Sequence, residues 1–185
     1  KILSQTKHRN IMINTKPTVT TNLITVSDDN TYIYLAETAR YSELYFKFTQ
    51  EYLSQYGISN GDKLCIELDG MLIEGTGTQA ANTSTRIGIT GCTWTDGNQG
   101  YKCLPENGHY CNYITIANNA SAISISFLNN PDWTGTNKIY EIQNLRVYKI
   151  EDTSEVGTYD CCKISTPDDL ELYKVNDTIY DKLDL

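Results

Sequence analysis

The chain has 185 residues, of which 39% are hydrophobic and 21% are charged, so it is long enough for one well-buried domain with or without an appendage. Its formal net charge of −8 and the absence of a basic patch argue against nucleic acid as a partner. No long apolar run occurs, so we expect no membrane insertion. The chain opens at Lys1 without an apolar signal segment, and we therefore expect a mature product or a fragment of a longer protein.

The predicted elements are mostly strands, because β-branched runs alternate with Gly-, Asn- and Asp-rich turns. A short helix is predicted from Gln50 to Gln55, with Thr49 as its N-cap and Gly57 as its stop. The apolar pattern changes parity between Ile142 and Leu145, which predicts a β-bulge near Gln143 and Asn144. In chain order, strands are predicted over 18–27, 31–36, 43–48, 63–69, 86–90, 112–117, 122–128 and 138–150, the sixth and seventh forming a hairpin.

These strands do not alternate with long helices, which disfavours a parallel sheet with crossover helices. We therefore predict an all-β fold, an antiparallel two-sheet β-sandwich with one short helix and long loops. The distribution of charge also divides the chain into two parts. Residues 151–185 hold 10 acids and 3 lysines, a net of −7, whereas residues 1–150 carry a net of −1. We predict a sandwich domain over 1–150, followed by an acidic C-terminal extension or the start of a further module over 151–185.

The stretch from Gly91 to Tyr113 (GCTWTDGNQGYKCLPENGHYCNY) is predicted to be a long ordered loop. It holds three of the six cysteines, one of the two tryptophans and one of the two histidines. Long ordered loops in compact domains are usually functional. Aromatic and polar groups on such a loop suit recognition of a ligand better than core packing.

Three segments carry a resemblance to known domains: Gly61–Leu68 (GDKLCIEL), Ile123–Leu128 (ISISFL) and Ile139–Ile150 (IYEIQNLRVYKI). They resemble strands of the jelly-roll carbohydrate-binding modules found in phage tail and fibre proteins and in bacterial glycan-degrading enzymes. This resemblance implies a two-sheet jelly roll that binds glycan on a sheet face or at its loop tips. It also implies a structural calcium, for which Glu141 is the matching position. The alternative for Glu141 is an exposed strand carboxylate.

Sugar recognition needs aromatic faces that cover a pyranose ring and planar polar groups that bind its hydroxyls. Both tryptophans have an alternative role, in which they plug the ends of the sandwich core. The predicted ligand-binding residues are Trp94, Asp96, Asn98, Gln99, Tyr101, Asn107, Tyr110, Asp132 and Trp133.

The cysteines of the Gly91–Tyr113 stretch offer two alternatives. Cys92, Cys103, His109 and Cys111 include the ligand types of a zinc site, but they lack a CxxC spacing. A disulfide brace is therefore preferred, with Cys103–Cys111 ahead of Cys92–Cys103 and Cys92–Cys111. A brace of this kind is typical of an extracellular or virion protein.

The sequence contains no GxSxG, P-loop, HExxH or GxGxxG motif, and only His8 and His109 supply imidazoles. A carboxylate pair of the glycosidase type stays open as an alternative. We predict that the chain is not an enzyme. The expected function is recognition of a glycan or cell-surface receptor within a larger extracellular or virion assembly, with other subunits as neighbours. The rival function is a structural sandwich that makes only protein–protein contacts.

Overall fold

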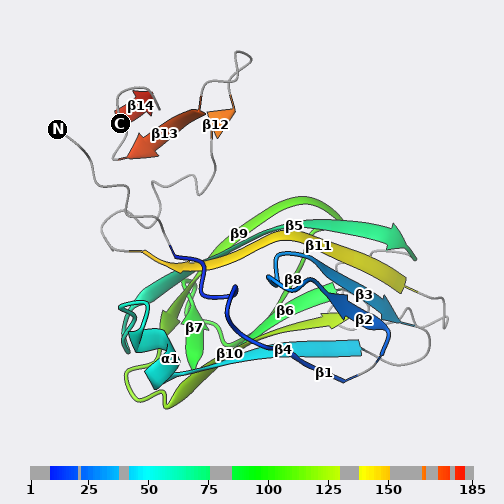
Figure 1. The fold of residues 1–185 in the computed structure, drawn as a ribbon, viewed down its shortest axis with the longest axis horizontal. Helices are drawn as coiled ribbons and strands as arrows, with labels where there is room; N and C mark the ends of the chain where they lie inside the picture. The colour runs from blue at the N-terminus through cyan, green and yellow to red at the C-terminus, as the bar shows by residue number, and fades with distance from the viewer. Residues whose placement is uncertain are drawn as a thin grey trace.

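A computed structural model describes residues 9–20, 22–37, 42–75, 85–129 and 138–150, together with short strands at 164–165, 171–175 and 178–181. Two antiparallel sheets pack face to face, as Figure 1 shows. The five-stranded sheet has the order β1-β4-β10-β6-β8 and the six-stranded sheet the order β2-β3-β11-β5-β9-β7. Their strands are β1 (Thr18–Val19), β2 (Ile24–Val26), β3 (Ile33–Glu37), β4 (Ser42–Thr49), β5 (Lys63–Glu74), β6 (Thr85–Thr90), β7 (Cys92–Trp94), β8 (Gly100–Cys103), β9 (Asn107–Ile116), β10 (Ala122–Asn129) and β11 (Lys138–Lys149).

The prediction of an all-β antiparallel sandwich with one short helix is confirmed. The central strands follow the jelly-roll arrangement, with β3-β11-β5-β9 in one sheet and β4-β10-β6-β8 in the other. The chain crosses between the two sheets at most of its connections. This crossing places the apolar face of each sheet against the other, so that a single core lies between them.

The core follows from the two-residue alternation of the strands. In β4 and β10 the apolar residues point inward and polar or small residues point outward, while the central β5 presents a longer apolar run. The fully buried residues of these three strands that form the core are Leu44, Phe46, Phe48, Leu64, Ile66, Leu68, Ile123, Ile125 and Phe127.

The short helix forms as predicted. Helix α1 (Gln50–Ser54) follows β4 directly, and the Thr49 side chain accepts a hydrogen bond from the Tyr52 backbone N–H at 3.2 Å. This bond satisfies one of the N–H groups that a helix leaves without a partner at its start. Gly57 has a φ of 68°, a conformation that glycine adopts without strain, and the chain turns there towards β5.

The predicted β-bulge is also present. The pairing of β11 with β5 shifts register between Gln143 and Arg146, and Asn144 has a φ of 54°. Asn144 tolerates this left-handed conformation better than most residues, and its side chain donates to Asp69 Oδ2 at 2.8 Å. The bulge brings both Ile142 and Leu145 into the core.

Asn129, at the end of β10, joins the two sheets. Its fully buried side chain donates to the Leu35 and Lys138 carbonyl oxygens of the six-stranded sheet, at 3.1 Å each. Its Oδ1 accepts from the Thr85 hydroxyl of the five-stranded sheet at 2.9 Å. One amide thus supplies hydrogen bonds to both layers where water cannot reach.

The N-terminal segment is tied to the last strand of the sandwich. The Asn10 side chain donates to the Leu145 carbonyl at 3.2 Å and accepts from the Val147 N–H at 3.0 Å. The Ile11 N–H donates to the Val147 carbonyl at 2.8 Å. Ile11 and Met12 are fully buried. These contacts hold the segment against β11.

Two sequence predictions are wrong at this level. The strands β9 and β10 were predicted to form a hairpin, but β9 pairs with β5 and β7 and β10 pairs with β4 and β6. The Gly91–Tyr113 stretch was predicted to be a loop, but it contains β7, β8 and most of β9.

Beyond residue 150 the described strands form a separate three-stranded sheet: β12 (Ile164–Ser165), β13 (Glu171–Val175) and β14 (Thr178–Asp181). The division of the chain near residue 150 stays a prediction. Within the described residues, no helix is long and apolar enough to span a bilayer.

Candidate functional site

The predicted ligand-binding residues of the Gly91–Tyr113 stretch lie in different parts of the sandwich. β7 pairs with β9 in the six-stranded sheet, whereas β8 pairs with β6 in the five-stranded sheet. Trp94 on β7 is 1% exposed and belongs to the core, and its indole N–H donates to the Gly100 carbonyl at 3.1 Å. Its ring offers no face to a ligand, which corrects its predicted place in a binding site.

The turn between β7 and β8 is exposed and polar. Asp96 Oδ1 accepts from the Asn98 backbone N–H at 3.0 Å, and Asp96 also forms an ion pair with Lys102. The hydrogen bond from Lys102 and those from Asn98 lower the pKa of Asp96 to about 2. Gln99 is exposed in the same turn. These side chains are accessible to a ligand, although Asp96 is already engaged.

The remaining predicted residues do not join this turn. Asn107 is exposed at the start of β9, where it pairs with Met71. Tyr110 packs against the core, and burial raises the pKa of its phenol to about 12. Asp132 and Trp133 lie outside the described residues.

Tyr101, in contrast, belongs to a row of residues that crosses the whole five-stranded sheet. Thr18, Tyr45, Ser126, Gly88 and Tyr101 are successive pairing partners from β1 to β8. Directly opposed residues of an antiparallel sheet point to the same face. Because the residues on either side of Tyr45, Ser126 and Gly88 in their strands are buried in the core, this tyrosine row lies on the outer face of the sheet.

Two aromatic side chains of the tyrosine row flank a low centre. Tyr45 is 37% exposed and Tyr101 is 48% exposed, and they are the most exposed aromatic side chains of the described residues. Ser126 and Gly88 lie between them. A Cβ atom at Gly88 would come within 2.5 Å of Tyr101 Cε1 and 2.7 Å of Ser126 Oγ. Because glycine has no side chain, the Tyr101 ring can pack directly against β6 at this position.

Cationic and hydroxyl groups surround this row. The Arg86 guanidinium carbon lies 4.9 Å from the centroid of the Tyr101 ring, within the range of a cation–π contact. Lys47 and Ser124 pair directly with each other. Each lies two residues from Tyr45 or Ser126 in its strand, so both point to the same outer face. The face thus combines aromatic surface with hydrogen-bond donors and acceptors.

Tyr45 was missed by the sequence analysis, although a signal for it was present. The alternation of Leu44, Phe46 and Phe48 predicts that Tyr45 points away from the core. Its relation to Tyr101 was not accessible, because four different strands must first be placed in register.

A second polar cluster lies on the outer face of the six-stranded sheet. His109 Nδ1 lies 2.9 Å from Asp69 Oδ1, and its Nε2 lies 3.5 Å from Glu67 Oε1. The hydrogen bond from Asn144, and then that from His109, hold the pKa of Asp69 below its usual value. Both imidazole nitrogens thus face carboxylates of β5, which gives His109 a bridging role between strands.

The zinc alternative finds no support among the described residues. Among the described residues, no group of three or more His, Cys, Asp or Glu side chains is arranged to hold a metal ion. Glu141 accepts from the Tyr32 hydroxyl at 2.9 Å and from the Gln143 amide at 3.3 Å. The structural calcium at Glu141 stays a prediction without a ligand set from the described residues.

The predicted disulfide brace is absent. No disulfide joins any two of the four described cysteines, Cys65, Cys92, Cys103 and Cys111. Cys103 is on β8 and Cys111 on β9, which belong to different sheets. The Cys111 thiol instead lies 3.4 Å from that of Cys65. Cys65 pairs with Tyr113, so Cys111 is its diagonal neighbour, at a Cα distance of roughly 7–8 Å that exceeds the usual span of a disulfide.

We expect no disulfide between any two of these four cysteines in the purified protein. Alkylation in denaturant without reductant, followed by peptide mapping, should find no cross-linked peptide that joins two of them. Denaturant is required because Cys65 and Cys92 are buried. A cross-linked peptide containing Cys103 and Cys111 would contradict this expectation and would restore the predicted brace.

No known protein family matches the sequence, and no curated protein matches it. Among solved structures, the chain is similar to the enzymatically active domain of tailspike protein 4 from bacteriophage CBA120. The two share 14% identity at a TM-score of 0.43, and the match covers 76% of this chain and 20% of the tailspike chain. This chain therefore matches about a fifth of that protein's length.

The description of this neighbour contradicts our prediction that the chain is not an enzyme, and we withdraw that prediction. The likeness assigns no activity to the present chain, because it is too distant to place catalytic residues.

Proposed function

We propose that the sandwich binds a glycan across the outer face of its five-stranded sheet. The observation that carries this proposal is the tyrosine row, in which the two most exposed aromatic side chains of the described residues share one register line. A pyranose ring has an apolar face that packs against an aromatic ring and hydroxyls that need planar polar partners. The row and the groups beside it offer both.

The spacing of the tyrosine row favours an oligosaccharide over a single sugar. Tyr45 on β4 and Tyr101 on β8 are three strand spacings apart, roughly 14 Å at about 4.8 Å per strand. A single pyranose covers one aromatic ring, whereas a sugar chain can stack on both. The Tyr101 ring lies over Gly88, so Ser126 is the low position between the two rings, and a short sugar chain can cross β10 from one ring to the other.

The accessible polar groups on this face suit hydroxyl recognition. Lys47 is exposed and Ser124 is partly exposed beside the row, and the Arg86 guanidinium lies against the Tyr101 ring. A glycan receptor on a cell surface, met by an extracellular or virion protein, is the partner that this chemistry fits.

A glycan array probed with the full chain, followed by titration of the best oligosaccharide, tests this function. We expect Tyr101→Ala and Tyr45→Ala each to weaken binding about tenfold, because each removes one stacking surface. Tyr34→Ala is the matched control, since Tyr34 is partly exposed on a strand of the other sheet. It should bind as the wild type does.

Two outcomes would contradict the proposal. A blank array leaves the rival function, a structural sandwich that makes only protein–protein contacts. Equal binding by wild type, Tyr45→Ala and Tyr101→Ala would remove the tyrosine row from any glycan site that the array reveals.

A further inference from the structure

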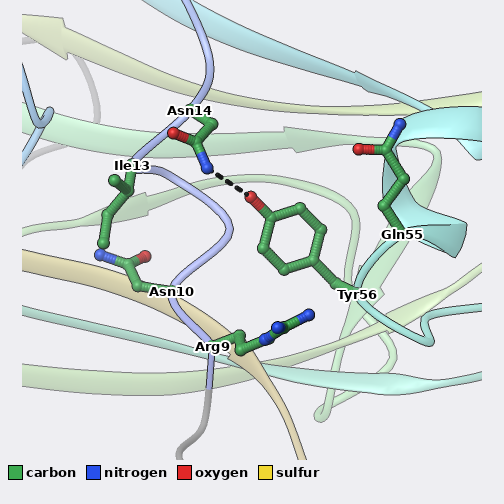
Figure 2. Close-up of a pocket in the computed structure, with 6 residues that line it drawn as sticks. All are labelled: Arg9, Asn10, Ile13, Asn14, Gln55 and Tyr56. Atoms are coloured by element: carbon green, nitrogen blue, oxygen red, sulfur yellow. Dashed lines mark hydrogen bonds between the residues drawn. The ribbon is translucent and has the colours of Figure 1, made fainter.

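A pocket of about 400 Å³ lies between the N-terminal segment and the end of helix α1, away from the tyrosine row. Figure 2 shows Arg9 and Asn14 from the N-terminal segment beside the ring of Tyr56. Its volume falls in the range of small-molecule sites. The lining residues are Arg9, Asn10, Ile13, Asn14, Gln55 and Tyr56.

The walls of this pocket are held in place by contacts outside it. Asn10 is bonded to β11, and the Asn30 side chain donates to the Met12 and Thr15 carbonyls at 2.6 and 2.7 Å. Tyr52 packs against Tyr56 with ring centroids 5.2 Å apart. A ligand would therefore meet a site that is already formed, which lowers the entropy cost of binding.

A directional chain of hydrogen bonds fixes the Tyr56 hydroxyl and the Asn14 amide. The Tyr52 hydroxyl donates to the Ile11 carbonyl at 2.6 Å, so its contact with Tyr56 at 3.1 Å requires Tyr56 to be the donor. Asn14 Nδ2 in turn donates to the Tyr56 hydroxyl at 3.2 Å. This chain leaves Asn14 Oδ1 as an acceptor for a ligand hydroxyl. The Gln55 amide supplies both donors and acceptors at the rim.

Arg9 gives the pocket its charge. It is exposed, no described carboxylate forms an ion pair with it, and no acidic residue or second cation is among the lining residues. A guanidinium binds a carboxylate through two parallel hydrogen bonds. One cation balances a monoanion, whereas a phosphate monoester carries more than one negative charge at neutral pH.

From this lining we propose that the pocket binds a carboxylate-bearing sugar, with the carboxylate on Arg9, the apolar face of the sugar against the Tyr56 ring and a hydroxyl on Asn14. The site is separate from the tyrosine row and does not depend on the function proposed for it. The two ligand classes also differ, because the glycan proposed for the tyrosine row does not need a carboxylate.

Calorimetric titration of the full chain with D-glucuronate, D-glucose and inorganic phosphate tests the proposal. Glucuronate should bind saturably, and at least tenfold more tightly than either glucose or phosphate. Arg9→Gln should lower the affinity for glucuronate about tenfold, to the level of glucose, because a charge-assisted bidentate contact is lost. Tyr56→Leu should weaken both sugars. Tyr101→Ala should leave glucuronate binding unchanged.

Lys16→Gln is the matched charge control, because Lys16 is an exposed cation near the segment but outside the pocket lining. It should bind glucuronate as the wild type does. Equal losses in Lys16→Gln and Arg9→Gln would show that only net charge matters. Phosphate binding as tightly as glucuronate would indicate a general anion site. Either result, or an absence of saturable glucuronate binding, overturns the proposal. Melting curves confirm that each variant is folded.

Discussion

Replacing Asn129 by alanine is expected to lower the free energy of unfolding by about 3 kcal/mol. The substitution removes the amide that bonds to Leu35 and Lys138 in one sheet and to Thr85 in the other. The two carbonyls and the Thr85 hydroxyl are buried, so they lose partners that water cannot replace. For a protein of this size, the melting temperature should fall by roughly 6–12 °C in a thermal scan.

Asn119→Ala is the matched control for this prediction, because Asn119 is exposed in the turn after β9. It should change stability by less than about 0.5 kcal/mol. A double-mutant cycle with Thr85→Val separates the shared hydrogen bond from the rest, and the two substitutions should cost less together than the sum of their separate effects. A change in melting temperature below about 2 °C for Asn129→Ala would mean that the sheets are held together without this amide.

Replacing Gly88 by alanine is expected to reduce glycan binding at least tenfold while leaving stability nearly unchanged. The new Cβ atom would lie 2.5 Å from Tyr101 Cε1, and the exposed ring is free to turn away. The tyrosine row then loses its flat end and gains bulk at its centre. The backbone of Gly88 does not have a positive φ, so alanine adds no backbone strain there, and only the Tyr101 and Ser126 side chains have to move.

Titration and a denaturant melt, run on the same Gly88→Ala preparation, separate these two effects. If the substitution acts by displacing the ring, the Gly88→Ala, Tyr101→Ala double variant should bind no more weakly than Tyr101→Ala alone. A Gly88→Ala protein that binds like the wild type would show that glycan does not lie across β6. A large loss of stability would show that position 88 supports the core instead.

Local chemistry was predictable from the sequence wherever a few neighbouring residues decide the structure. Thr49 followed by a polar first turn predicts the helix start, and the parity change around Asn144 predicts the bulge. Alternating apolar residues identified most of the core strands. In each case the deciding residues are within one turn or one strand of each other.

Pairing between distant strands was not predictable in the same way. The turn after β9 resembles that of a hairpin, but the core requires β9 and β10 to lie in opposite sheets. The Gly91–Tyr113 stretch has the composition of a loop, yet tertiary pairing turns much of it into strand. Trp94 was expected at a ligand because its neighbours are polar, and its burial depends on the pairing of β7 with β9 and on β8, which lies against its ring.

The site shows the same limit. Tyr101 was identified from its loop-like surroundings. Tyr45 and Gly88 could not be assigned to the same site until the register of β4, β10, β6 and β8 was known. The pocket at Arg9 and Tyr56 joins residues far apart in the sequence, and no motif links them.

The tie between Asn10 and β11 has a consequence for how this sandwich can be used in a larger chain. The chain enters the sandwich beside Val147 and leaves it just beyond, where the Ile150 N–H donates to the Lys63 carbonyl at 3.0 Å. Adjacent entry and exit points are what domain insertion requires. A unit built in this way can be accommodated in a surface loop of a host protein without separating the host's own strands.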